Sequence, residues 1–129
     1  MAEESGGPQR LAQKVGEIIQ REFQNNISVK DLAKRIGVTP NYLSAVYRRE
    51  TGETIMDTVL ERKMELAKRL LQEAKLKIGQ IATATGFSSP YYFSRRFHQY
   101  QGVSPTAYRE QAQGAGARQP GRRRSAGKK

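Results

Sequence analysis

Apolar residues recur along most of this chain with the period of an α-helix. The first stretch carries Leu11, Val15, Ile18, Ile19 and Phe23, and this spacing places all five side chains on one helix face. Similar stripes follow further along the chain, and each is separated from the next by a glycine or by a hydroxyl residue that precedes a helix. We therefore expect an all-α protein of about seven helices.

Capping residues mark where several of these helices begin. Ser28 with Asp31 is close to a capping box, with aspartate in place of the usual glutamate, and Thr54 with Asp57 repeats the pattern. Three further starts pair a hydroxyl cap with a proline that suits the first helical turn: Thr39-Pro40, Ser89-Pro90 and Ser104-Pro105.

One supersecondary unit occurs twice in the chain. Before the central turn the two copies match at a distance of 49 residues, and after it at 50, so the second turn is longer by one residue. The matched positions are Leu32-Ala33 with Ile81-Ala82, Gly37-Val38 with Gly86-Phe87, and then Leu43, Tyr47 and Gly52 with Phe93, Phe97 and Gly102. In each copy a glycine permits the positive φ of a tight turn between two helices. The repeat predicts two helix-turn-helix lobes.

The longest helical stretch, residues 54–74, has two apolar stripes instead of one. They are Ile55, Val59, Leu66 and Leu70, and then Met56, Leu60, Met64, Ala67 and Leu71. Together they cover about half of the helix circumference, which indicates a linker helix packed by a lobe on each side rather than a groove for a partner. We expect a disordered N-terminus over 1–8, a first lobe over 9–53, this linker, a second lobe over 75–112 and a disordered basic tail over 113–129.

The chain is strongly basic, with 23 Lys+Arg against 12 Asp+Glu and a net charge of +11. Residues 113–129 contribute +6 and the remainder +5, so the part expected to fold is basic without its tail. This charge favours an acidic partner, most simply nucleic acid. With no cysteine, one histidine and no glycine-rich phosphate loop, we expect no enzyme, no metal and no cofactor. No apolar run approaches the ~20 residues of a membrane span, so we expect a cytoplasmic, nucleoid-associated protein without membrane contact.

Several short sequence motifs follow one another in a characteristic order along both copies and the linker. In the second copy they are Gly86-Phe87, Tyr92-Phe93-Ser94-Arg95, Phe97, Gly102, Ser104-Pro105 and Tyr108-Arg109. In the first copy and the linker they are Leu32-Ala33, Gly37-Val38, Tyr42-Leu43-Ser44, Arg49-Glu50-Thr51-Gly52, Lys63-Met64, Ala67 and Leu70-Leu71. Over about residues 9–111 the chain thereby resembles the AraC/XylS family of bacterial transcription regulators. Lys63 stands where many members have arginine.

The resemblance implies two helix-turn-helix lobes whose recognition helices enter successive major grooves on one face of DNA. The implied partners are double-stranded promoter DNA and RNA polymerase, and no small molecule is expected to bind this segment. Many relatives carry a separate sensing or receiver domain. The chain is therefore either a stand-alone regulator or the DNA-binding fragment of a longer one, and activation and repression both fit.

The outward faces expected on the two recognition helices supply the candidate DNA contacts. The candidates for base edges are Asn41, Ser44, Ala45, Pro90, Tyr91, Ser94 and Arg95. The candidates for phosphates are Thr39, Arg48, Arg49, Ser89, Arg96 and His98. Arginine pairs bidentately with guanine O6 and N7, which makes Arg95 the sharpest candidate, although phosphate contact and a solvated charge are the alternatives.

Other residues fit two roles. Asn41 can read adenine or cap its helix, and Tyr92 fits a core or rim position at least as well as base stacking. Lys30, Lys34 and Arg35 are expected on a solvated face, with one phosphate contact at most. The alternative to a sequence-specific regulator is a basic helical module that binds nucleic acid by charge and shape, as architectural or RNA-binding proteins do.

Overall fold

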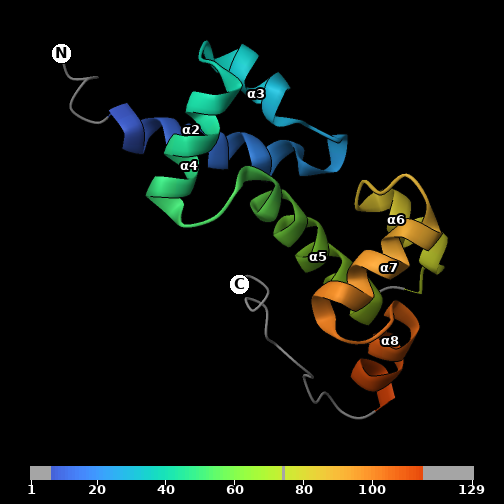
Figure 1. The fold of residues 1–129 in the computed structure, drawn as a ribbon. Helices are drawn as coiled ribbons and strands as arrows, with labels where there is room; N and C mark the ends of the chain where they lie inside the picture. The colour runs from blue at the N-terminus through green and yellow to red at the C-terminus, as the bar shows by residue number, and fades with distance from the viewer. Residues whose placement is uncertain (1–6, 74, 115–129) are drawn as a thin grey trace. The chain divides into compact units, whose positions relative to one another are not determined.

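A computed structural model describes residues 7–73 and 75–114 of the chain (Figure 1). This part is helical without a strand, which confirms the all-α prediction. In chain order the elements are α2 (Gly7–Glu22), the 3-10 helix η1 (Phe23–Asn25), α3 (Val29–Ile36), α4 (Pro40–Thr51), α5 (Ile55–Glu73), α6 (Ile78–Ala84), α7 (Pro90–Gln101) and α8 (Pro105–Gly114). The chain divides into two compact units, and the boundary falls inside α5, between Arg62 and Lys63.

The expected boundaries differ slightly from those in the structure. Helix α2 already includes Gly7 and Pro8, because proline is tolerated in a first helical turn, so the predicted disorder is wrong for these two residues. Helix α8 continues to Gly114, two residues into the predicted tail. The remaining residues of both predicted disordered segments, 1–6 and 115–129, lie outside the described residues, as does Ala74.

The first unit packs α2, α3 and α4 around one apolar core, which the start of α5 completes. Val15, Ile19, Leu32 and Leu43 are fully buried at its centre. Ala33 is also buried, and its small side chain lets α3 and α4 approach closely. Burial of these stripes is the main stabilising term, since helices this short are marginal in water on their own.

The second unit is built around an aromatic row. The rings of Phe87 and Phe93 lie 5.3 Å apart, those of Phe93 and Phe97 5.8 Å, and those of Phe97 and Tyr108 5.5 Å. Such tilted and edge-to-face pairs are favourable beyond their buried area. The row joins the turn before α7 to α7 and α8. The side chain of Tyr108 is buried, so α8 closes this unit.

The sequence repeat is also a repeat of backbone geometry. Gly37 and Gly86 have φ of 94° and 91°, in the left-handed region that the two turns require. The next residue donates back across the turn in both copies, from Val38 N to Ala33 O at 3.0 Å and from Phe87 N to Ala82 O at 2.9 Å. These bonds satisfy helix carbonyls that would otherwise lack a partner.

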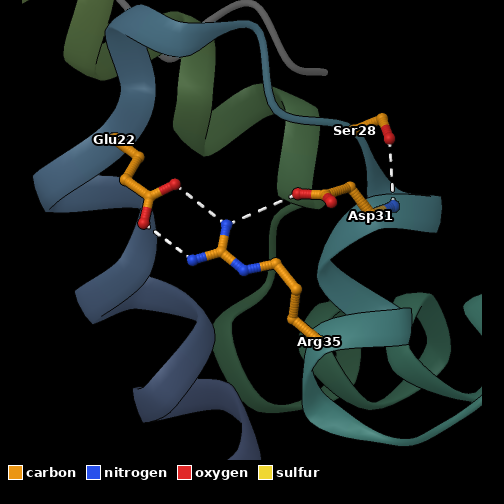
Figure 2. Close-up of polar contacts among 4 residues, drawn as sticks. All are labelled: Glu22, Ser28, Asp31 and Arg35. Atoms are coloured by element: carbon orange, nitrogen blue, oxygen red, sulfur yellow. Dashed lines mark hydrogen bonds and ion pairs between the residues drawn. The ribbon is translucent and has the colours of Figure 1, made fainter.

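The helix caps form largely as their sequences predict. Thr54 and Asp57 make the reciprocal bonds of a capping box, at 3.0 and 3.1 Å. Ser28 Oγ accepts from the amide of Asp31 at 3.0 Å, but the Asp31 carboxylate contacts Arg35 at 3.4 Å (Figure 2). Helix α3 therefore begins with a serine cap, and an ion pair between Asp31 and Arg35 is added to it.

One residue of the two apolar stripes predicted on the linker helix is not buried. Met56 is 47% exposed, so its expected burial is wrong. Ile55 and Val59 face the core of the first unit instead, and Met56 follows Ile55 by about 100° around the helix, which turns it away. Further along α5, Met64, Ala67 and Leu71 are fully buried in the second unit, as predicted.

Candidate nucleic-acid interface

Helix α4 presents a polar front and an apolar back. Leu43, Val46 and Tyr47 are buried against the first unit. The opposite face carries four of the residues that the sequence predicts as DNA contacts, and all four are exposed: Asn41, Ser44, Ala45 and Arg48. Because α4 is amphipathic and its front is free of large apolar side chains apart from Tyr42, this face can approach the edges of base pairs.

Helix α7 repeats this division with larger side chains. Phe93 and Phe97 are buried. On the front, Pro90, Tyr91, Arg95 and His98 are exposed, and Ser94 is half-buried beside them. The guanidinium carbon of Arg95 lies 5.9 Å from the centre of the Tyr91 ring, within the range of a cation–π contact.

Both recognition helices begin with the same capping geometry. Thr39 Oγ1 accepts from the amide of Tyr42 and Ser89 Oγ accepts from the amide of Tyr92, each at 3.1 Å. A hydroxyl that accepts still has its own O–H to donate, and a phosphate oxygen is a suitable acceptor. The positive end of each helix dipole also favours an anion there. Thr39 and Ser89 therefore retain the chemistry of a phosphate contact while they cap.

The other predicted phosphate contacts differ in their exposure and in their side-chain partners. Arg96 is half-buried, because it occupies the position that buried Val46 has in α4. It donates to Gln99 Oε1 at 2.9 Å. Arg49 lies 3.7 Å from the Glu50 carboxylate. Arg48 and His98 are the matching exposed residues one turn beyond the base-reading positions.

Two tyrosines frame the fronts of these helices. Tyr92 is 50% exposed, and its ring centre lies 5.8 Å from that of Phe87 in an edge-to-face arrangement, which supports the predicted rim role. Tyr42 occupies the same place in the first unit and is also 50% exposed. Sequence reasoning missed Tyr42, although the shift of 50 residues that relates the copies maps it directly onto Tyr92.

A hydrogen-bonded chain supports the C-terminal end of α4. The hydroxyls of Tyr47 and Thr58 lie 2.8 Å apart, and Thr58 Oγ1 donates to Glu53 Oε1 at 2.9 Å. Since Thr58 gives its proton to the carboxylate, Tyr47 is the donor to Thr58. Burial raises the pKa of Tyr47 above its ordinary value of 10.0, at which a phenol already keeps its proton at neutral pH.

Lys63 supports the turn that leads into α7. Its ammonium donates to Gly86 O at 3.3 Å and lies 4.8 Å from the centre of the Phe87 ring. Burial lowers the pKa of Lys63, since desolvation disfavours its charged form. From the sequence this position stands out only as a departure from arginine. A lysine still holds the turn here as a single-point donor, without the bidentate geometry of a guanidinium.

Arg35 is exposed as expected, and it also forms an ion pair. Its two terminal nitrogens bind the two carboxylate oxygens of Glu22 at 2.9 and 2.7 Å, and one also reaches Asp31 (Figure 2). These bonds raise the pKa of Arg35 and lower the pKa of Glu22. The contact ties α3 to the end of α2. Lys30 and Lys34 are also exposed, as expected.

The described residues hold neither a cluster of metal ligands nor a membrane-spanning helix. Across residues 7–73 and 75–114, no three histidine, aspartate or glutamate side chains are arranged to hold a metal ion. In that part, no helix has the length and apolar character to span a membrane.

Comparison with known proteins agrees with this geometry. A family model described as a helix-turn-helix domain matches residues 32–111. The Msm operon regulatory protein of Streptococcus mutans is 29% identical over 113 residues, which cover 88% of this chain and 41% of that protein. The HTH-type transcriptional activator AarP of Providencia stuartii is 32% identical over 91 residues, covering 70% of this chain and 67% of AarP.

Solved structures share the fold. The C-terminal domain of AraT, a response regulator from Geobacillus stearothermophilus, superposes with a TM-score of 0.77 at 31% identity, covering 80% of this chain and 86% of that one. An AraC-type regulator from Chromobacterium violaceum gives 0.72 at 26% identity, covering 82% and 95%.

These matches and the doubled helix-turn-helix unit define the class as helix-turn-helix transcription regulators. Within this class, the chain belongs to the AraC/XylS family, as its motifs indicate. It spans 41% of the length of the Msm regulator and 13% of that of the Bacillus subtilis regulator YtdP.

Proposed function

We propose that this chain is the DNA-binding module of a bacterial transcription regulator that recognises a specific double-stranded promoter sequence. Helices α4 and α7 would enter successive major grooves on one DNA face. The observation that carries the proposal is the matched design of these helices, each with a hydroxyl cap, a buried apolar back and an exposed polar front. Base-reading helices of helix-turn-helix proteins need this arrangement.

The proposal assigns different tasks to the exposed side chains. Asn41, Ser44 and Ala45 on α4 and Pro90, Tyr91, Ser94 and Arg95 on α7 would face base edges. Thr39, Arg48, Arg49, Ser89, Arg96 and His98 would contact phosphates. The regulator would act in the cytoplasm at the nucleoid, with RNA polymerase as its second partner. This segment would catalyse no reaction and would bind no small molecule.

Selection of binding sites from random duplex DNA tests this function. If a preferred sequence emerges, Arg95→Ala should weaken binding by about 1–3 kcal/mol at one guanine position and relax the preference there. Arg48→Ala should weaken binding to all sequences about equally. It should also lower by about one the slope of the logarithm of the binding constant against the logarithm of the salt concentration. Asn41→Ala should relax the preference less than Arg95→Ala, since an amide is a weaker, uncharged reader. No enrichment of any sequence would favour a module that binds by charge and shape instead.

A further inference from the structure

The exposed front of α7 carries a contact that α4 lacks. Tyr91 and Arg95 are one helical turn apart, and the guanidinium carbon lies 5.9 Å from the ring centre. Residues at i and i+4 are neighbours on a helix surface, so the pair can form without help from any other element. The matching positions of the first unit are Asn41 and Ala45, which have no ring and no charge to pair. The contact is therefore a property of the second recognition helix.

The Tyr91 ring is poorly explained as part of the fold. It is 72% exposed, whereas the tyrosine beside it, Tyr92, packs its ring against Phe87. An exposed ring at the start of a helix gains little by burial, yet here it limits the positions open to a long arginine side chain. Arg96, the next arginine, is held by Gln99 and does not share this face. Arg95 is thus the guanidinium that the ring orders.

We infer that Tyr91 and Arg95 act together as one reader of a guanine and an adjacent thymine. This inference rests on the proposed function of α7 as a recognition helix. Arg95 supplies the two parallel donors that match guanine O6 and N7. Tyr91 supplies an apolar face for the C5-methyl group of thymine, the one apolar feature of the major-groove edge. Tyr91 also positions Arg95, because a side chain that is already ordered loses less freedom on binding.

The experiment uses the duplex that site selection yields for the full chain. In that duplex the thymine beside the guanine is replaced by deoxyuridine, which removes only the methyl group. The wild type should bind the deoxyuridine duplex about fourfold more weakly, as expected for one buried methyl-sized group. Tyr91→Ala should bind both duplexes equally, and Tyr91→Phe, which keeps the ring, should retain the wild-type difference.

A second readout tests whether Tyr91 positions Arg95. Replacing the G·C pair by A·T should weaken wild-type binding by about 5- to 150-fold, and this ratio should fall at least severalfold in Tyr91→Ala while Tyr91→Phe preserves it. Arg96→Ala is the matched control, which should lower affinity for both duplexes without changing the ratio. Thermal unfolding of each variant verifies that α7 is intact, which is expected because Tyr91 is mostly exposed.

The outcomes separate this inference from the function on which it rests. A selected site that lacks a thymine next to the guanine, or a deoxyuridine duplex bound as tightly as the original, overturns the joint reading while sequence-specific binding stands. An unchanged guanine ratio in Tyr91→Ala overturns the positioning role. If selection enriches no sequence at all, both the proposed function and this inference fail.

Discussion

The buried pair Tyr47 and Thr58 gives the sharpest test of how the first unit is held together. Tyr47 is 4% exposed and Thr58 9%, and their hydroxyls lie 2.8 Å apart. Thr58→Val keeps the shape of the side chain but removes the acceptor, so the Tyr47 hydroxyl stays buried without its partner. A buried polar group left in this way costs about 1–3 kcal/mol of unfolding free energy.

The reverse substitution should be milder. Tyr47→Phe removes the donor, but Thr58 can still donate to Glu53, so a loss of about 0.5–1.5 kcal/mol is expected. In the double variant neither polar group remains to be desolvated. Its loss should therefore fall short of the sum of the single losses by at least about 0.5 kcal/mol. The double variant should also be more stable than Thr58→Val alone.

The assay has to report on the first unit separately, because the chain has no tryptophan and circular dichroism sums both units. Amide hydrogen exchange at Leu43 and Val46 under increasing urea gives the opening free energy of α4. Tyr42→Phe is the matched control, since it makes the same chemical change at an exposed position and should stay within about 0.5 kcal/mol of the wild type. Additive losses in the double variant would refute the coupled hydrogen bond and leave only separate packing effects.

Three further predictions concern charge and spacing. Residues 115–129 hold six basic residues and no acid. Deleting them should reduce the salt dependence of DNA binding by about 0.9 in the log–log slope for each phosphate that they neutralise, and the selected sequence should stay the same. A changed sequence would mean that the segment contacts bases. Inserting half a helical turn of DNA between the two segments that α4 and α7 would contact should remove most specific affinity in a binding titration, whereas unchanged affinity would mean that the recognition helices engage independently. Because Arg35 lowers the pKa of Glu22, their stabilisation is present above the ordinary value of 4.5 and is lost as pH falls through the lower folded pKa. Glu22→Gln should therefore melt below the wild type at neutral pH and converge with it in acid, and an equal difference at both pH values would contradict the pairing.

The sequence could predict the fold because most of its signals are local. Helix periodicity, hydroxyl caps and the turn glycines act within a few residues, and each recurs in the second copy. Phe93 and Phe97 could be assigned to the core for the same reason, and so could the exposed face that carries Arg95. The Tyr91–Arg95 contact was within reach as well, because a spacing of four residues on a helix implies it.

The contacts that the sequence did not predict join residues that are far apart in the chain. Lys63 and Gly86 are 23 residues apart, and Glu22 and Arg35 are 13 apart. Their partners depend on how helices pack, which periodicity does not specify. The exposure of Met56 has the same origin, since the stripe assigns it to an apolar arc but only packing decides which part of that arc is covered.

Comparison of the two units shows which features can vary. At the shift of 50 residues, Tyr47 corresponds to Phe97 and Thr58 corresponds to Tyr108. The first unit thus has its tyrosine on the recognition helix, and the second unit has it on the helix that follows. There the Tyr108 hydroxyl accepts from Gln72 at 2.8 Å, and the buried ring pair replaces the buried hydrogen bond. Both units nevertheless share the turn glycine and the hydroxyl cap of the recognition helix. Because the backbone unit tolerates such exchanges even inside its core, its exposed front can change with still less constraint. The difference between Asn41 and Ala45 on α4 and the Tyr91–Arg95 pair on α7 is thus a difference in reading chemistry on one common scaffold.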